Sequence, residues 1–135
     1  MLRNSSYKTG IDEIDKQNYD LIDRVDEMMN TEDNGERLKQ LGIFEELVKK
    51  YFEREQRLHN ECRYFDSYWH HIIHELYITK LLHTKQIFTE AGATPGNKEI
   101  FRRQVVEFLK DHIMCHDRSF ANFYNNIILL ENRAG

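Results

Sequence analysis

The sequence predicts an all-α fold: an up-down-up-down antiparallel four-helix bundle with a polar N-terminal arm and a C-terminal helical extension. Apolar residues recur at steps of three and four along four stretches, which is the spacing of the buried face of a bundle helix. One proline and six glycines leave few helix breakers in 135 residues. No alternating strand pattern competes with this periodicity, and a chain of this length forms one domain.

The first two predicted helices are separated by a loop of turn-forming residues. A polar arm, residues 1–10, precedes the first helix, which covers about 11–29. The loop 31–35 contains Asp, Asn and Gly, which favour turns. The second helix covers about 36–62, and its inner face is predicted from strictly alternating steps of three and four. That face comprises Leu41, Phe44, Val48, Tyr51, Glu55, Leu58 and Cys62.

The second half of the chain supplies two further helices. A loop at 63–66 precedes the third helix, which ends before the glycine- and proline-containing segment 92–97. The fourth helix is predicted to start near Lys98, and the bundle to end at about residue 117. Residues 118–135 are predicted to form a further helical segment packed on the bundle, with a frayed end.

Charge and cysteine content exclude several classes of protein. The formal net charge is −4, from 19 basic and 23 acidic residues without a basic cluster, so we expect no nucleic-acid partner. Cys62 and Cys115 do not make a disulfide framework. The N-terminus lacks the apolar core of a signal peptide, and no apolar run reaches membrane length. We therefore expect a cytoplasmic protein without a membrane partner.

Three histidines and two carboxylates are the candidate functional residues. His70 and His74 are four residues apart, so both imidazoles leave the same face of a helix. Glu55 and His112 also lie on inner faces. Asp117 follows His112 by five residues, about 140° away on an ideal helix, so it faces inward only where the helix is distorted or ends. This nitrogen and oxygen set suits iron or zinc, and five donors leave a sixth position open.

The ordered set of donors resembles the hemerythrin family, specifically its single-domain bacterial oxygen-binding members. The resemblance covers about residues 7–120. The matching motifs are GIDEIDKQ at 10–17, Glu55, the HxxxH of His70 and His74, and the HxxxxD of His112 and Asp117. It implies a non-haem di-iron site in which the three histidines hold one iron and the two carboxylates bridge both. It also implies a ligand pocket lined by Leu21, Phe52, Phe108, Leu109 and Ile113.

The chain departs from the family pattern at Asn18 and Tyr51, where the family has the two histidines of the second, oxygen-binding iron. Asn18 is expected to be a hydrogen-bonding partner. Tyr51 has two interpretations: a buried tyrosine hydrogen-bonded to Glu55 or Asn18, or a phenolate ligand of a ferric ion. His59, one turn beyond Glu55, is either a histidine at the edge of the helix face or a substitute donor.

Three functions fit these residues. The first is a hemerythrin-like non-haem iron protein that holds two irons, with an altered second half-site, and binds or senses dioxygen, peroxide or nitric oxide. The second is a sensor or storage domain with one iron or zinc ion that no longer carries oxygen. The third is a metal-free bundle that acts as an interaction module. No catalytic residues are predicted, and peroxide or oxidase-like turnover is expected at most as a side activity.

Overall fold

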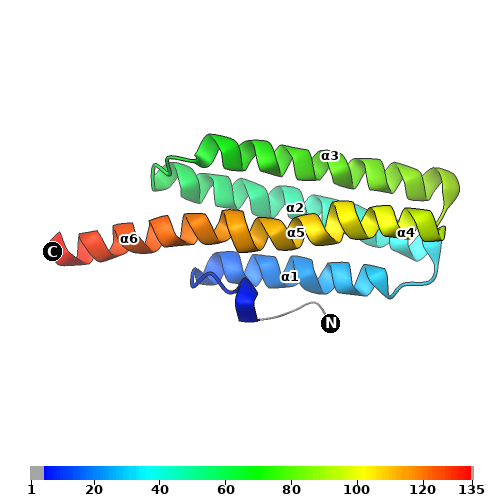
Figure 1. Cartoon of the computed structure of the whole chain (residues 1–135), viewed down its shortest axis with the longest axis horizontal. Coiled ribbons are helices and arrows are strands. Elements are labelled where there is room, and N and C mark those ends of the chain that lie inside the picture. Colours follow the sequence, from blue (N-terminus) through cyan, green and yellow to red (C-terminus); the bar gives the residue numbers. More distant parts are fainter. Residues whose placement is uncertain (1–4, 135) are drawn as a thin grey trace.

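The computed structural model describes residues 5–134, and every element in this range is a helix. Residues 1–4 of the predicted arm and Gly135 lie outside the described residues. The helices form four rods, which lie side by side (Figure 1). The predicted all-α class is therefore confirmed for the described residues. None of the helices within 5–134 is long and apolar enough to cross a membrane.

The N-terminal residues are anchored to the first rod. Helix α1 spans Asp12–Met29 and has three acidic side chains in its first turn, where negative charge interacts favourably with the helix dipole and stabilises the helix. The short 3₁₀ turn η1, Ser5–Tyr7, places Tyr7 in the core. The backbone N–H groups of Thr9 and Gly10 donate to the carboxylate of Asp15, at 2.7 and 3.1 Å. The described part of the predicted arm is thus packed against the bundle.

A side-chain cap begins the second rod, and a glycine ends the third. Helix α2 spans Asn34–Glu61, and the carboxylate of Asp33 accepts a hydrogen bond from the N–H of Glu36 at 2.8 Å. Helix α3 spans Ser67–Ala91. It ends at Gly92, whose φ of 72° is a backbone conformation that glycine adopts without steric cost.

The fourth rod begins earlier than predicted and continues without a break to the end of the described chain. Thr94 accepts a hydrogen bond from the N–H of Asn97, and Pro95 occupies the first turn, a position where its missing N–H is not needed. The rod comprises α4 (Pro95–Phe101), η2 (Arg102–Glu107), α5 (Phe108–Asp111), η3 (His112–Asp117) and α6 (Arg118–Ala134), of which η2 and η3 are π-helical.

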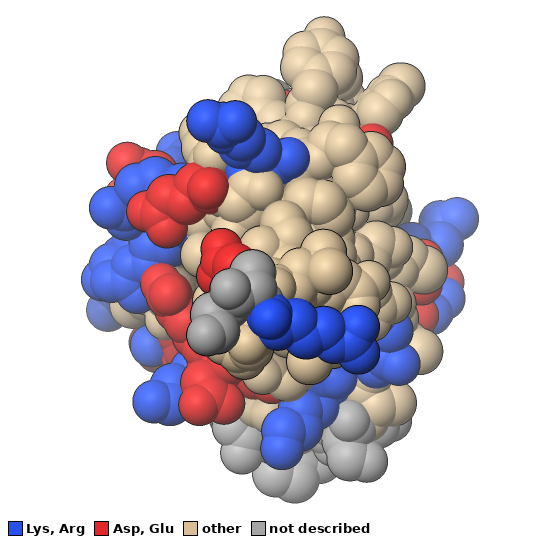
Figure 2. Space-filling model, turned by 90° about the vertical axis from the view of Figure 1, so that its left-hand side faces the viewer, with Lys and Arg blue, Asp and Glu red and all other residues tan. Residues whose placement is uncertain are grey.

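The C-terminal residues extend this rod rather than folding back as a separate packed segment. Phe120 and Ala121 are buried, whereas Leu129 and Leu130 are mainly exposed. Only the beginning of α6 therefore packs on the bundle, and its end projects beyond the other helices (Figure 1). Viewed from this end, the molecule has a broad uncharged surface beside clusters of charged side chains (Figure 2). Exposed rings near this end include Phe65, Tyr68 and Trp69.

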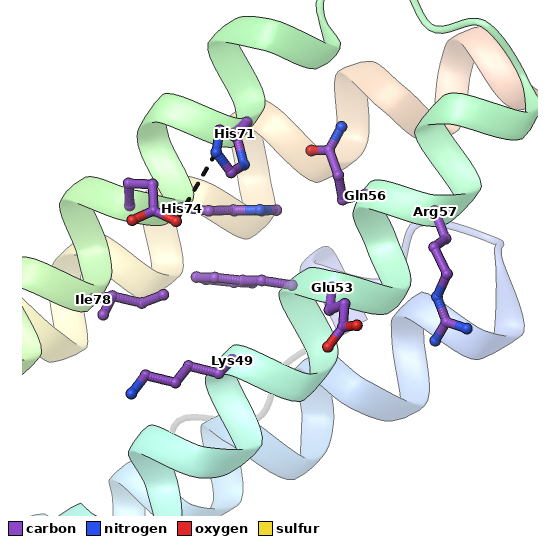
Figure 3. Close-up of a pocket in the computed structure, with 9 residues that line it drawn as sticks. Lys49, Glu53, Gln56, Arg57, His71, His74 and Ile78 are labelled. Carbon is purple, nitrogen blue, oxygen red and sulfur yellow. Dashed lines mark ion pairs between the residues drawn. The ribbon is translucent and has the colours of Figure 1, made fainter.

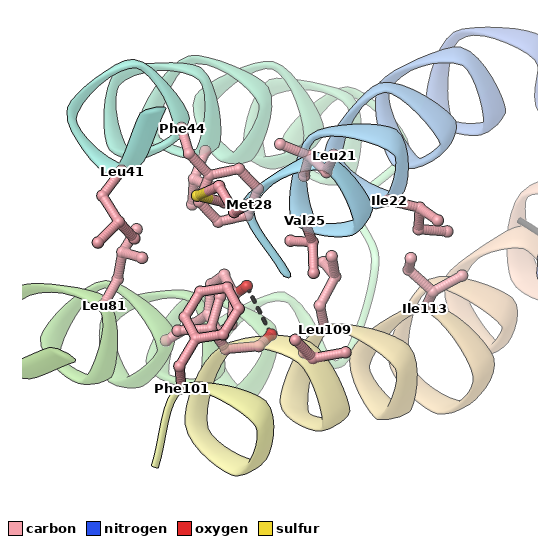
Figure 4. Packing of buried hydrophobic residues seen from close by; sticks show 14 of the residues in the cluster. Leu21, Ile22, Val25, Met28, Leu41, Phe44, Leu81, Phe101, Leu109 and Ile113 are labelled. Atoms are coloured by element: carbon pink, nitrogen blue, oxygen red, sulfur yellow. Dashed lines mark hydrogen bonds between the residues drawn. The ribbon is translucent and has the colours of Figure 1, made fainter. Parts of the chain in front are cut away.

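The main hydrophobic core fills the space between the four rods. The labelled side chains converge from α1, α2, α3 and the fourth rod (Figure 4): Leu21, Ile22, Val25, Met28, Leu41, Phe44, Leu81, Phe101, Leu109 and Ile113. Burying one such side chain stabilises the fold by about 1.5–3 kcal/mol. The hydroxyl of Tyr77 donates to the carbonyl of Val105 at 2.9 Å, which links α3 to the π-helical η2.

Candidate metal centre

Four buried side chains from three rods bring their ligand atoms together inside the bundle. Glu55 comes from α2, His70 and His74 from α3, and His112 from the start of η3, and their ligand atoms all lie within 4.8 Å of one another. The Nε2 atoms of His70 and His74 each lie 3.3 Å from Nε2 of His112. Glu55 Oε1 lies 2.5 Å from His70 Nε2 and 3.4 Å from His74 Nε2. This buried cluster could hold a metal ion.

A π-helical turn brings Asp117 to the same cluster. In η3 the backbone hydrogen bonds join residues five apart, so His112 and Asp117 face nearly the same direction. Asp117 Oδ1 lies 3.1 Å from His112 Nε2 and 3.3 Å from His70 Nε2. The distortion required by the spacing of these two residues is present. The helix does not end there, since α6 follows directly.

Each of the two carboxylates retains an oxygen that no hydrogen bond from residues 5–134 satisfies. Glu55 Oε1 and Asp117 Oδ1 are buried and have no partner in hydrogen-bond geometry within this range, although imidazole nitrogens lie close to both. Buried polar atoms in native proteins almost always have partners, because an unsatisfied one costs about 1–3 kcal/mol. Orphaned carboxylate oxygens that face three imidazole nitrogens fit a cation that all five side chains would share.

Protonation in the metal-free protein follows from the same demand for positive charge. Burial favours neutral His70, but its interactions with Asp117 and Glu55 outweigh burial and raise its pKa to about 9. Burial and the charge of Asp117 raise the pKa of Glu55. Burial opposes ionisation of Asp117 too, yet His112 and His70 hold its pKa well below the usual value. A protonated His70 thus supplies the positive charge that a metal ion would supply.

Asn18 contacts the carboxylate of Asp117 on its other oxygen. The Nδ2 group of Asn18 donates to Asp117 Oδ2 at 2.9 Å, and both side chains are buried. Asn18 is therefore a hydrogen-bonding residue in this structure. The bond links α1 to η3 and fixes the orientation of Asp117, leaving its Oδ1 toward the three histidines.

Tyr51 has neither of the hydrogen-bond partners expected from the sequence. Its hydroxyl donates to Asp20 Oδ2 at 2.5 Å, not to Glu55 or Asn18, and the residue is only partly buried. Burial and then the hydrogen bond to Asp20 raise the pKa of the Tyr51 phenol. The structure thus pairs Tyr51 with a carboxylate of α1.

His59 is not at the edge of the helix face, as one interpretation expected, but is completely buried. Its exposed fraction is 0%, its Nε2 lies 3.6 Å from Glu55 Oε1, and neither ring nitrogen has a hydrogen-bond partner among the described residues. Burial, followed by the charge of His70, lowers the pKa of His59 to about 3, which keeps the imidazole neutral.

The partial exposure of Tyr51 and the complete burial of His59 differ from the predicted face of α2 for the same reason. Strictly alternating steps of three and four have a period of 3.5 residues, whereas an α-helix has 3.6, so the predicted stripe drifts by about 20° every seven residues. The buried residues on the central face of α2 are Leu41, Phe44, Val48, Phe52, Glu55 and His59. In the sequence, the burial of His59 is indicated by its position four residues after Glu55, on the same face of the helix.

The predicted pocket residues pack into the core. Leu21, Phe52, Leu109 and Ile113 are buried in the main core cluster, and the half-buried Phe108 stacks on Tyr77 with ring centroids 5.3 Å apart.

A cavity of about 420 Å³ opens instead between α2 and α3, beside His74. Phe52 separates it from the core and stacks on His74 with ring centroids 3.7 Å apart and planes 6° apart. Figure 3 shows side chains of both helices around this cavity: Lys49, Glu53, Gln56, Arg57, His71, His74 and Ile78. The exposed residues of this group gave no sequence signal for a cavity.

Comparisons with protein-family models, with curated proteins and with solved structures found no match to this chain.

Proposed function

We propose that this chain is a hemerythrin-like metal-binding protein, an up-down-up-down antiparallel bundle that holds one iron ion and binds or senses a small ligand such as dioxygen, peroxide or nitric oxide. The observation that carries the proposal is the convergence of three imidazole Nε2 atoms with the orphaned Oε1 of Glu55. Asp117 Oδ1 adds a fifth donor. Three nitrogens and two oxygens form a set that suits iron, with zinc as the alternative metal.

The contacts of Asn18 and Tyr51 favour one ion over two. A second ion bridged by Asp117 would need its Oδ2, which already accepts a hydrogen bond from Asn18. Tyr51 would have to leave Asp20 to act as a ligand. The second half-site of the resemblance therefore has its polar groups engaged with other protein groups. Five donors for one ion leave a sixth position for a small ligand.

The protein residues would contribute exclusion of water and control of protons. When bound, iron would supply a redox-active position for the ligand. Phe52 covers one face of His74, and the ligand-bearing side chains are at most 4% exposed. His70 must give up its proton before its Nε2 can accept a metal, so loading releases a proton. The low polarity around the centre strengthens its electrostatic interactions.

Metal stoichiometry tests the number of ions. The metal-free protein would be loaded anaerobically with Fe²⁺, and separately with Zn²⁺, desalted and analysed for metal per chain by mass spectrometry. We expect one ion per chain. Two iron ions per chain would support the di-iron alternative, and no bound metal would overturn the proposal in favour of a metal-free interaction module.

Ligand binding needs a separate measurement on the iron-loaded protein. Dioxygen, hydrogen peroxide and nitric oxide would each be added to the ferrous protein while its visible absorption is recorded. We expect at least one ligand to change the spectrum with saturation at one equivalent. A loaded protein that responds to none of the three would overturn the sensing function and leave metal storage.

A further inference from the structure

His59 is a buried polar side chain that lacks a hydrogen-bond partner. Its exposed fraction is 0%, and both Nδ1 and Nε2 are unsatisfied among the described residues. A neutral imidazole has one donor and one acceptor nitrogen, and burying both without partners costs free energy. An apolar residue at this position would avoid that cost, so the imidazole needs another reason to be there.

Among the described residues, Glu55 is the carboxylate that lies close to His59. Its ring lies between aromatic side chains, with centroid distances of 4.2 Å to Phe120, 4.4 Å to His70 and 5.1 Å to Tyr64. Glu55 Oε1 lies 3.6 Å from its Nε2, slightly beyond hydrogen-bond distance. Glu55 is on the same helix one turn earlier, so a small rotation of its carboxylate changes this distance.

His59 does not belong to the set of converging ligand atoms. The group whose donors lie within 4.8 Å of one another comprises Glu55, His70, His74 and His112 without His59. A second ion at His59 would have to share Glu55, because Asp117 Oδ2 is engaged by Asn18. The geometry therefore favours contact with a ligand carboxylate over direct metal binding.

We propose that His59 is a positioning residue whose Nε2–H donates to the carboxylate of Glu55 when a metal ion occupies the centre. This inference rests on the proposed metal site. A metal ion shared by the three histidines would be bound by the orphaned Oε1 of Glu55, and a hydrogen bond from His59 would then fix the orientation of that carboxylate. Groups that hydrogen-bond metal-binding side chains in this way typically raise metal affinity by 10–100-fold.

Substitution of His59 gives two effects of opposite sign. In the His59→Leu variant we expect the affinity for Zn²⁺, measured by competition with a chelating dye, to fall by about 10–100-fold. We expect the metal-free variant to melt at a higher temperature than the metal-free wild type, because the unsatisfied nitrogens are gone. A role in packing alone would not weaken zinc binding while stabilising the metal-free fold.

The conservative variant and a matched control complete the test. His59→Gln retains an N–H donor, so it is expected to recover most of the lost affinity. His83→Leu removes an exposed histidine of α3 and is expected to leave zinc affinity unchanged. Zinc affinity of His59→Leu within twofold of the wild-type value would overturn the inference. Absence of zinc binding by the wild type would instead overturn the proposed function.

Nuclear magnetic resonance of the wild-type imidazoles provides a readout if His59→Leu does not fold. Upon zinc loading we expect the His59 Nε2–H proton to appear at a hydrogen-bonded chemical shift. With ¹¹³Cd in place of zinc, three histidines are expected to show nitrogen–cadmium coupling and His59 is not. Coupling of cadmium to His59, or an Nε2–H signal that does not respond to loading, would overturn the inference.

Discussion

The two halves of the centre differ in where their polar atoms are directed. On the side of His70, His74 and His112, nitrogens and carboxylate oxygens approach one another and two oxygens remain unsatisfied. On the side of Asn18 and Tyr51, these two side chains donate hydrogen bonds to Asp117 and Asp20 at 2.9 and 2.5 Å. Both halves lie in one bundle, yet of the two only the first combines converging imidazole nitrogens with carboxylate oxygens that lack a hydrogen bond among the described residues.

This comparison shows that polar residue types at suitable helical positions are not sufficient for a metal site. Asn18 and Tyr51 carry oxygen and nitrogen atoms, but their bonds to Asp117 and Asp20 satisfy them. On the histidine side, Glu55 Oε1 and Asp117 Oδ1 have no hydrogen bond among the described residues, although three imidazole nitrogens lie close to them. Unsatisfied buried atoms therefore distinguish a candidate ligand set from a polar network that supports itself.

The largest expected effect comes from removing one imidazole of the histidine side. His74→Ala removes one converging nitrogen and the ring that stacks on Phe52, so we expect no retained metal after desalting. Metal analysis of the purified variant checks this, with circular dichroism to verify helix content. His83→Ala serves as the control, and wild-type metal content in His74→Ala would contradict the proposed centre.

Converting the other half into a ligand set is the complementary change. The double variant Asn18→His and Tyr51→His supplies the two histidines that the resemblance expects and removes the hydrogen bonds to Asp117 and Asp20. We expect the number of iron ions per chain to rise from one to two in metal analysis of the iron-loaded variant. Unchanged stoichiometry would mean that the second half-site differs from the resemblance beyond these two residues.

The pH dependence of metal binding reports on protons that a metal ion displaces. The pKa of His70 in the metal-free protein is about 9, so its imidazole is protonated at neutral pH and its proton must leave on loading. Zinc affinity is therefore expected to fall as pH decreases below 9, by about 10-fold per pH unit for one displaced proton, or about 100-fold from pH 8 to 6.

The raised pKa of Glu55 adds competition by a second proton as the pH falls further. Zinc titrations at several pH values check the slope, and calorimetry in buffers of different ionisation enthalpy counts the protons released. An affinity that stays constant between pH 6 and 8 would contradict the pairing of His70 with the two carboxylates.

The smallest effect is expected on the side of Asn18 and Tyr51, whose side chains are hydrogen-bonded to Asp117 and Asp20. Tyr51→Phe removes the hydrogen bond to Asp20, so we expect a loss of about 1 kcal/mol in the free energy of unfolding and unchanged metal content. Chemical denaturation and metal analysis measure both. If the ferric wild-type protein has a broad visible phenolate band that Tyr51→Phe lacks, Tyr51 is a metal ligand and the comparison of the two halves fails.

The helices and most of the candidate donors follow from local features of the sequence. The spacing of four between His70 and His74 places both on one face of a single regular helix. Gly92 ends that helix, and Thr94 and Pro95 begin the next one, through local backbone geometry. The spacing of His112 and Asp117 also predicted a local distortion, because five residues do not align on an α-helix. These features depend on short-range geometry, which a sequence specifies directly.

Which buried polar atoms have hydrogen-bond partners depends on contacts between helices. The partner of Tyr51 is Asp20 on another helix, and the partner of Asn18 is Asp117, 99 residues away. The burial of His59 depends on a small difference in helical period and on rings from the α2–α3 loop and α6. Hydrogen-bond partners and orphaned atoms depend on how the rods are rotated against one another, which is set by packing of the whole bundle.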